Sequence, residues 1–331
     1  MTVLAAGGTI AMAGDRATPA LDADALLADV PALADVAGLR ARSLTALPGA
    51  HLGTADALAI ARAALAEAEA GHGVVITHGT DTLEETAVLC DVLHGRPEPI
   101  ALTGAIRPAS AAGADGPANL LDAVAVARAP QSDGLGALVV FAGEVHAARA
   151  ARKVASIAPA AFGSPATGPL GVVAEGRVRI AARPLRPATP LATPAALDAR
   201  VPIVPTFLGD DGDGLRAALR DGADAIVFVA LGAGHVAPPV LDALRTAAAA
   251  VPVALTVRPE RGLLLHRTYG FEGAEGDLRA SGALPAGGLS PQAARIVLLA
   301  ALGAGATRAA LADALDPEPP SASRSPRDSP A

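Results

Sequence analysis

Short apolar runs alternate with longer amphipathic stretches through residues 1–130, and this alternation constrains the fold more than any other feature of the chain. A strand buried on both faces of a parallel sheet is a short apolar run, and a helix that crosses between two such strands has one apolar and one polar face. The pattern therefore predicts an α/β fold in which a larger N-terminal domain is built on a parallel sheet with crossover helices.

The expected elements of this N-terminal domain follow one another in chain order. The apolar runs predict strands at residues 2–6, 39–47, 73–77, 100–103 and 135–142. The amphipathic stretches predict helices at residues 21–30, 56–70, 82–93 and 119–128. A hairpin that turns at Glu175 and Gly176 is predicted for residues 171–183.

The rest of the chain divides into a linker, a second domain and a tail. Residues 184–200 contain four prolines and are interpreted as a linker between a domain of residues 1–183 and one of residues 201–315. The smaller C-terminal α/β domain is predicted to contain strands at residues 202–205, 225–230 and 252–257 and helices at residues 213–220, 239–250 and 291–302. Residues 316–331, rich in Pro, Ser and charged side chains, are predicted to form a disordered tail.

The side chains available for the core are small. Hydrophobic residues make up 51% of the chain but aromatic residues only 2%, with five Phe, one Tyr and no Trp. Such a core depends on many contacts among Ala, Val, Leu and Ile between closely spaced elements. The same apolar content, with 18% charged residues, excludes a disordered polyampholyte.

Charge and hydropathy narrow the class of partner to small molecules. A formal net charge of −7, without any basic block, argues against nucleic acid. No run of about 18 apolar residues is free of charges and helix breakers, so no membrane span is expected. Because residues 1–8 lack the basic start of a secretory signal, we expect a soluble cytoplasmic protein.

Neither a metal nor an organic cofactor is expected. The sequence has no HExxH motif and no cluster of His and Cys for a metal, and no GxGxxG or GxxxxGK[ST] motif for a nucleotide. The one cysteine, Cys90, lies in an apolar helical run, where a buried structural thiol is favoured over a nucleophile.

Two threonine-bearing loops follow predicted parallel strands, at the edge where open α/β sheets bind their ligands. Thr9 comes after two glycines that follow the first strand, and Thr80 and Asp81 come after Gly79, which follows the third. His78, before Gly79, is expected to orient this second turn. Asp81 is also a good helix N-cap, so a purely structural explanation of this residue stays open.

Lys153 is the single lysine among 26 basic residues. In a chain that so strongly prefers arginine, a retained lysine indicates a need for a compact amine that can lose its proton; the alternative is a leftover surface residue. A neutral lysine activates a threonine hydroxyl by taking its proton. Thr80, Lys153 and Asp81 would form a self-consistent set, with Thr9 as a second hydroxyl, provided that the fold brings them together.

Several motifs occur in a fixed order between residues 2 and 302: AAGGTIAM, VVITHGTDTLEETA, LTGAIRP with ADGPANLLDAV, TGPLGVV and SPQAARIVLL. On these motifs the chain resembles the bacterial-type L-asparaginase and glutaminase-asparaginase family. The resemblance implies hydrolysis of asparagine to aspartate and ammonia without a cofactor. It also implies a homo-oligomer, a dimer or tetramer, in which a loop from the partner's second domain completes each site.

The resemblance also implies a role for each candidate residue. Thr9 would be the nucleophile that forms an acyl-enzyme ester. Thr80, Lys153 and Asp81 would form a polar triad, in which Asp81 also contacts the substrate's α-amino group. Asn119, the only asparagine, is expected to tie its helix to a neighbouring loop, with a direct contact to the substrate as the alternative.

The chain departs from the family's pattern at three places. Residues 14–24 lack the tyrosine that helps to orient the nucleophile, and Ala233 replaces an Asn found in some members. Gly49 stands where the family often has a serine that binds the substrate carboxylate, so the binding loop would consist of Gly49, Ala50 and His51. One lost hydrogen bond to a carboxylate weakens binding by about 1.5–3 kcal/mol, on the order of ten- to a hundredfold. His51 either replaces that bond or faces the solvent.

These departures leave two alternatives beside an asparaginase. One is a related amidase that prefers glutamine, D-asparagine or another small amide. The other is a catalytically silent amino-acid-binding protein of the same fold. The intact set of candidate catalytic residues argues against the second alternative, because a binding protein needs no lysine base.

Overall fold

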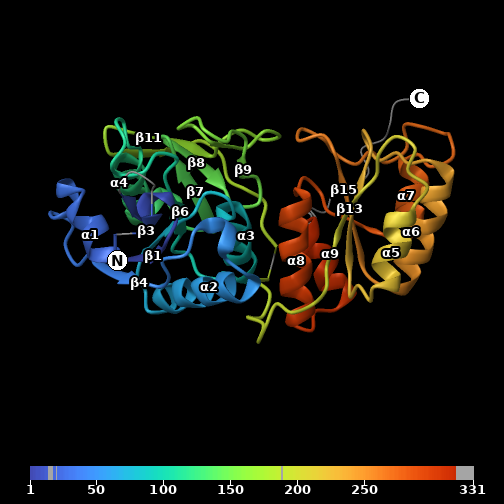
Figure 1. Cartoon of the computed structure of the whole chain (residues 1–331), viewed down its shortest axis with the longest axis horizontal. Coiled ribbons are helices and arrows are strands. Elements are labelled where there is room, and N and C mark those ends of the chain that lie inside the picture. The colour runs from blue at the N-terminus through green and yellow to red at the C-terminus, as the bar shows by residue number, and fades with distance from the viewer. Residues whose placement is uncertain (14–17, 20, 188, 318–331) are drawn as a thin grey trace, which may run out of the picture.

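The computed structural model describes residues 1–13, 18–19, 21–187 and 189–317. The two largest sheets lie in different parts of the chain, each with helices packed around it (Figure 1). The larger sheet is N-terminal and the smaller one C-terminal, so the predicted fold class is confirmed. The predicted tail falls mostly on residues 318–331, which lie outside the described residues.

The first sheet combines a parallel part with an antiparallel edge. Its strands, in spatial order, are β12 (Arg177–Ile180), β11 (Gly171–Ala174), β8 (Glu144–Ala147), β7 (Ala137–Phe141), β6 (Ile100–Thr103), β5 (Val74–His78), β1 (Thr2–Ala6) and β4 (Arg40–Ser43). The strands from β4 to β7 run parallel, and they correspond to the five predicted apolar runs. The sequence missed β8, which pairs antiparallel with β7 after a tight turn at Ala142 and Gly143, both with positive φ.

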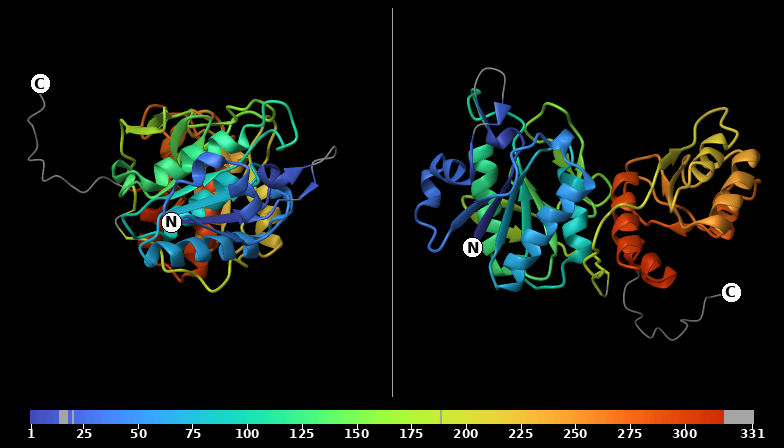
Figure 2. Two further views of the ribbon diagram at one scale, coloured as in Figure 1. Left: turned by 90° about the vertical axis from the view of Figure 1, so that its left-hand side faces the viewer. Right: turned by 60° about the horizontal axis from the view of Figure 1, so that its bottom comes forward.

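Helices cover both faces of this sheet, as the right-hand view of Figure 2 shows. Residues on β1 alternate between the faces: Val3 and Ala5 pack with α1 (Ala23–Ala28) and α4 (Gly116–Arg128), whereas Leu4 and Ala6 pack with α2 (Thr54–Glu69) and α3 (Leu83–Leu93). All these helices were predicted. α4 begins three residues earlier than predicted, because the proline in its first turn is compatible with a helix start.

The second sheet is wholly parallel, in the order β13 (Ile203–Pro205), β14 (Ile226–Ala230), β15 (Val253–Val257) and β16 (Leu284–Pro285). Its helices are α5 (Asp213–Arg220), α6 (Pro238–Ala250), α7 (Glu275–Ala280), α8 (Pro291–Gly303) and α9 (Arg308–Leu315). The sequence missed β16, α7 and α9, because segments of two to eight residues are too short to show a clear period.

The two units share a hydrophobic core. α8 packs against α3 of the first unit, and one apolar cluster continues from Leu89 on α3 to Leu298 on α8. Figure 1 shows α8 standing between the two sheets. Alanines such as Ala294 and Ala301 are buried in this layer, which lets the helices approach closely despite the scarcity of aromatic rings.

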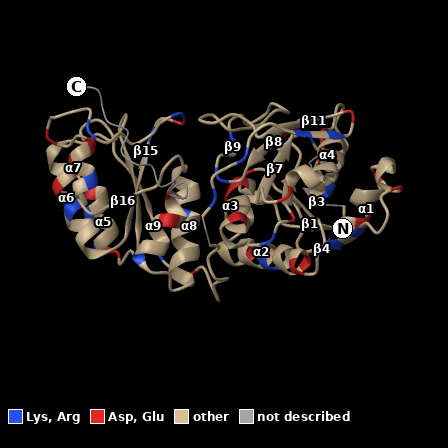
Figure 3. Ribbon diagram, turned by 180° about the vertical axis from the view of Figure 1, so that it is seen from behind, with Lys and Arg blue, Asp and Glu red and all other residues tan. Residues whose placement is uncertain are grey.

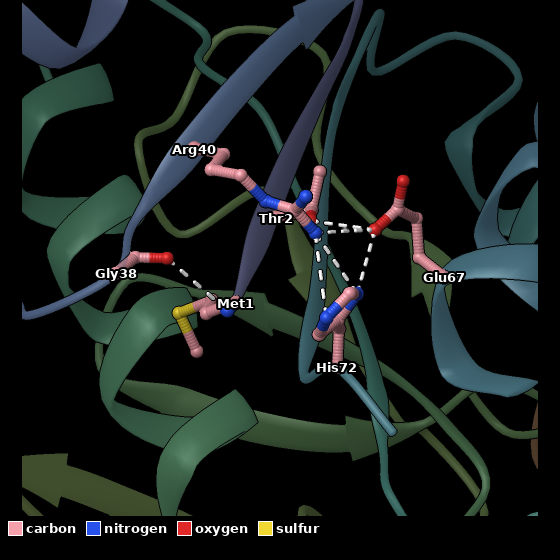
Figure 4. Close-up of polar contacts among 6 residues, drawn as sticks. All are labelled: Met1, Thr2, Gly38, Arg40, Glu67 and His72. Carbon is pink, nitrogen blue, oxygen red and sulfur yellow. Dashed lines mark hydrogen bonds and ion pairs between the residues drawn. The ribbon is translucent and has the colours of Figure 1, made fainter. Parts of the chain in front are cut away.

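A polar cluster at the start of β1 ties the first sheet to α2 (Figure 4). The Thr2 hydroxyl donates to Glu67 Oε2 at 2.7 Å, and Arg40 Nη2 donates to the same oxygen at 3.2 Å and to His72 at 3.0 Å. The hydrogen bond from Thr2 is the main cause that holds the pKa of the Glu67 carboxyl below its ordinary value. This amino-edge cluster lies at the end of the strands opposite to the predicted site.

Charged positions are spread over both units. In Figure 3, acidic and basic positions alternate along the ribbons of α5 and α6 instead of gathering into a basic face. No helix within the described ranges is long and apolar enough to cross a bilayer.

Candidate active site

Two loops leave the first sheet side by side at the carboxyl ends of β1 and β5. These strands are parallel neighbours, and Ala6 at the end of β1 is opposite His78 at the end of β5. β1 continues through glycines into a short 3-10 helix, η1 (Thr9–Ala11), and β5 continues through Gly79 towards α3. The two candidate threonines therefore lie on adjacent loops.

Glycines bring these loops into direct backbone contact. A β-carbon on Gly8 would lie 2.3 Å from the Cα of Gly79, and one on Gly79 would lie 2.5 Å from the Cα of Gly49. Carbon atoms do not approach so closely, so each position requires a residue without a side chain. Gly8 also has a φ of +83°, a conformation that favours glycine. The loops of Thr9, Thr80 and Gly49 can meet only because of these glycines.

The structure brings Lys153 to Thr80 and Asp81 across more than 70 residues of sequence. Lys153 Nζ donates to Thr80 Oγ1 at 2.9 Å and to Asp81 Oδ1 at 2.7 Å. The Thr80 residue is 6% exposed and the Lys153 side chain 21%, whereas the Asp81 side chain is 58% exposed. The amine thus joins a buried hydroxyl to a carboxylate that still has an oxygen open to a ligand.

Lys153 reaches this position from the short strand β9 (Arg152–Lys153), which pairs with β10 (Phe162–Gly163). The backbone N–H of Lys153 donates to Glu84 Oε2 on α3 at 2.5 Å. Burial raises the pKa of the Glu84 carboxyl above its ordinary value, and this hydrogen bond partly offsets that effect. β9 is therefore attached to the same helix that Thr80 and Asp81 precede.

Thr9 is placed beside this group but outside its hydrogen bonds. The residue is half-buried at the start of η1. Within the described ranges, its hydroxyl has no hydrogen-bond partner. A threonine hydroxyl without a hydrogen-bond partner is free to contact a ligand, whereas the Thr80 oxygen already accepts a hydrogen bond from Lys153.

His78 holds the turn between β5 and Thr80 in its neutral form. Burial lowers the pKa of its imidazole to about 4. Nδ1 lies 2.8 Å from the Gly79 carbonyl and Nε2 lies 3.0 Å from the Thr86 hydroxyl. Because a carbonyl oxygen only accepts, Nδ1 carries the proton and Nε2 accepts from Thr86. The neutral ring therefore positions the loop.

The predicted substrate-binding residues Gly49, Ala50 and His51 form a second 3-10 helix, η3 (Gly49–His51). Gly49 is buried, and its carbonyl accepts a hydrogen bond of 2.9 Å from the Thr82 hydroxyl. Ala50 and His51 are exposed. A β-carbon on Gly49 would lie 3.0 Å from the carbonyl carbon of Gly79, so a serine here would require the backbone to move. This close contact gives a physical reason for the missing hydroxyl.

The other departures from the family pattern lie elsewhere in the fold or outside the described residues. Residues 14–17 and 20 of the loop that lacks a tyrosine are not described. Ala233 lies in a tight turn after β14, closed by pairing of Leu231 with His235, in the second unit. The single tyrosine, Tyr269, packs edge-on against His235 in that unit, with ring centres 4.7 Å apart.

The two remaining side chains singled out from the sequence, those of Asn119 and Cys90, have structural roles. Asn119 donates to the Gly104 carbonyl and accepts from the Ala142 N–H, each at 3.0 Å, so it ties α4 to the loops after β6 and β7. Cys90 is fully buried, and burial raises the pKa of its thiol to about 12. In the part of the chain that the structure describes, no group of three or more His, Cys, Asp and Glu is arranged to hold a metal.

Models of known families match almost the whole chain. A model described as "Asparaginase, N-terminal" matches residues 1–186, and one described as "Glutaminase/Asparaginase C-terminal domain" matches residues 200–315. The chain belongs to the asparaginase family. The resemblance inferred from the motifs is thereby confirmed.

Curated relatives and a solved structure agree with this membership. The chain is 40% identical over 267 residues to a probable L-asparaginase of Deinococcus radiodurans, which covers 79% of this chain and 80% of the relative. It is 32% identical over 314 residues to L-asparaginase 2 of Escherichia coli, covering 91% of this chain and 88% of the relative. A probable cytoplasmic L-asparaginase from Campylobacter jejuni superposes with a TM-score of 0.83 at 28% identity, covering 95% and 98% of the two chains.

Sequence reasoning missed two features of the site. The first is the contact among Gly8, Gly49 and Gly79, which depends on loops far apart in the chain. The second is Glu84, which lies only three residues after Asp81 and was predicted merely as part of a helix. Its place in the first turn of a helix beside Asp81 was the available signal, but a glutamate there is also explained by the helix dipole.

Proposed function

We propose that this chain hydrolyses L-asparagine to L-aspartate and ammonia through an ester with Thr9. The observation that carries the proposal is the pair of hydrogen bonds from the single lysine to Thr80 and Asp81, at 2.9 Å and 2.7 Å, beside the loop of Thr9. The named activity of the relatives, L-asparaginase, supports the choice of substrate.

In this mechanism the Thr9 oxygen attacks the side-chain amide carbon of asparagine, and the hydroxyl proton passes to a base. A neutral Lys153 amine is that base, with Thr80 between it and the substrate: as the Thr80 oxygen takes the Thr9 proton, the Thr80 hydroxyl proton passes to Lys153 Nζ, 2.9 Å away. The tetrahedral intermediate collapses as the amide nitrogen takes a proton and leaves as ammonia. Water then attacks the ester, and aspartate and the Thr9 hydroxyl are released.

Substrate recognition combines one charged group with backbone donors. The exposed Asp81 oxygen not bonded to Lys153 is available for the substrate's α-ammonium group. Gly49 provides no hydroxyl for the α-carboxylate, so N–H groups of the loops around Gly49 and Gly79 would bind it. We therefore expect weaker binding of asparagine than a serine at this position would give, by about 1.5–3 kcal/mol.

Ammonia release from L-asparagine by the purified full chain tests this function. Wild type is expected to turn over, and Thr80→Val, which keeps the shape but removes the hydroxyl, is expected to lose about 10²–10⁴-fold in kcat. Equal rates for the two proteins would refute the mechanism.

A substrate panel distinguishes the related alternatives. The absence of a side chain at Gly49 favours testing glutamine, D-asparagine and short amides beside L-asparagine. A clear preference for another amide would replace the proposed substrate. Calorimetric binding of aspartate without turnover of any amide would instead indicate a silent binding protein.

We also propose that the chain works as a cytoplasmic homo-oligomer, a dimer or tetramer. Large apolar side chains in the segments that follow β13 and β15 are at least 48% exposed, and we take them as a candidate surface for a second copy. They are Phe207, Leu208, Leu263, Tyr269 and Phe271. One relative is a probable periplasmic L-asparaginase of Haemophilus influenzae and one solved structure is of a probable cytoplasmic L-asparaginase, so fractionation of the source cells tests the location. Light scattering tests the oligomer, and a monomer at micromolar concentration would contradict it.

A further inference from the structure

Lys153 depends on very little regular structure for its position. β9 contains two residues and pairs only with the two residues of β10. Beyond this pair, the chain returns through an exposed turn that includes Val154 and Ile157, 45% and 84% exposed. A ribbon this short is marginal by itself, so another contact must fix the lysine relative to Thr80.

Glu84 provides that contact from the opposite side of β9. Its Oε2 accepts the Lys153 backbone N–H at 2.5 Å, across 69 positions of sequence. Figure 3 shows the basic β9 lying beside the acidic start of α3. Since α3 packs on α2 and on α8, the acceptor belongs to the rigid centre of the molecule. Lys153 is thus held between β10 and a fixed helix.

Lys153 is bound at two of its atoms by residues at the start of α3. Thr80 and Asp81 lie just before Thr82, the N-cap of α3, and Glu84 lies in the first turn of this helix. The helix start therefore holds both ends of Lys153: Glu84 binds the backbone nitrogen, and Thr80 and Asp81 bind the side-chain nitrogen. A shift of β9 by about 1 Å would stretch these hydrogen bonds beyond their normal length.

The neighbouring Glu85 provides a contrast. It shares the first turn of α3, and burial raises the pKa of its carboxyl as it does that of Glu84. Its main charged neighbour is Arg295 on α8, and the described chain gives it no hydrogen bond to β9. The two glutamates match in position and environment, but only Glu84 contacts the lysine strand.

We propose that Glu84 is a positioning residue for the reaction, whose carboxylate sets the place of the Lys153 amine by binding the Lys153 backbone N–H. This role rests on the proposed function of Lys153 as the base. Glu84 acts through the acceptor oxygen rather than through its charge, so a glutamine, whose amide oxygen also accepts, preserves it. An alanine leaves the N–H of Lys153 without its acceptor and releases β9.

The test compares Glu84→Ala and Glu84→Gln with the matched control Glu85→Ala in the full chain. The expected result is a loss of kcat of about 100-fold for Glu84→Ala with a smaller change of KM, since misplacement of a catalytic group by about 1 Å has that effect. Glu84→Gln is expected to stay within about threefold of wild type because it keeps the acceptor. Glu85→Ala is expected to match wild type.

The single lysine provides a second readout that does not require activity. Protein labelled with carbon-13 at lysine Cε gives one side-chain NMR signal, from Lys153. We expect Glu84→Ala to move this signal to the position of a free lysine side chain, while Glu84→Gln and Glu85→Ala leave it in place. A thermal melt of each variant separates this local change from general unfolding.

Two results would overturn the proposal. One is a wild-type lysine signal and wild-type kcat in Glu84→Ala. The other is an equal displacement in Glu84→Gln and Glu84→Ala, which would assign the effect to charge. If wild type itself released no ammonia, the proposed function would fail, and the lysine signal would still decide whether Glu84 positions Lys153.

Discussion

The first sheet has a polar cluster at each end of its strands, and the two clusters differ in how completely their groups are paired. At the amino edge, Thr2, Arg40 and His72 each form a hydrogen bond with Glu67, and Arg40 also forms one with His72. At the carboxyl edge, Lys153 is held by Thr80 and Asp81, but Asp81 stays 58% exposed and the Thr9 hydroxyl has no partner within the described ranges.

This difference separates a structural cluster from a candidate catalytic one. The amino-edge groups satisfy one another and join β1, β4 and α2, so a ligand would find few free donors or acceptors there. The carboxyl edge instead brings backbones together through glycines and leaves oxygens open. We expect changes at the carboxyl edge to lower activity, in some cases together with stability, and changes at the amino edge to act on stability alone.

The largest expected effect is that of Lys153→Met, which removes the base but keeps an unbranched side chain. We predict a loss of kcat of about 10²–10⁴-fold with little change in the free energy of unfolding. Lys153→Arg, which keeps the positive charge but cannot lose a proton, should lose as much. Stopped or steady-state ammonia assays measure both. Full activity of the arginine variant would show that charge alone suffices.

Acid should lower the free energy of unfolding through His78, which lies at the carboxyl edge of the first sheet. Its pKa is lowered by burial from 6.5 to about 4, so the unfolded chain binds the extra proton between these values. The neutral His78 therefore contributes its full stabilisation above pH 6.5. This contribution decreases as the pH falls through this range and does not change further below about pH 4. Its size is about 3 kcal/mol.

Urea unfolding at pH 7 and at pH 4.5 measures this loss. The variant His78→Gln should lose less than wild type over the same interval, because the titrating ring is gone. His94 and His146, whose pKa values are also lowered by burial, act in the same direction and remain in both proteins. An identical pH dependence in the two proteins would argue against a neutral buried His78.

Gly79→Ala tests the contact among the loops. The new β-carbon would meet the Cα of Gly49 at 2.5 Å, so we predict a loss of about 1–3 kcal/mol together with reduced activity. Gly276→Ala on α7, where nothing lies within 4 Å of the added carbon, is the control and should be neutral or stabilising by up to about 1 kcal/mol. Denaturant melts compare the two. A Gly79→Ala protein as stable and active as wild type would refute the need for glycine there.

The smallest effect is expected at the amino edge. Glu67→Gln removes the charge shared by Arg40 and His72, whose side chains are 57% and 34% exposed, so the loss of stability should be about 0.2–1 kcal/mol. kcat and KM for asparagine should not change. A decrease in kcat at constant stability would mean that the two ends of the sheet are coupled.

The sequence predicted most of the helices and strands but few of the contacts between residues far apart in the chain. The parallel strands and their helices follow from apolar period, and Lys153 was identified because it is the only lysine. The second strand of a tight hairpin, β8, was missed because its partner's apolar run hid the turn. Glu84 could not be identified, because its partner is a backbone N–H 69 residues away, and a backbone group leaves no trace in the sequence.

Mass spectrometry of the full chain, mixed with L-asparagine and quenched in acid within milliseconds, tests the central claim most directly. Peptide mapping then locates any acyl group. The account predicts an aspartyl ester on the peptide that contains Thr9, with Thr80 unmodified. An ester on the Thr80 peptide, or ammonia release without any acylated peptide, would contradict it.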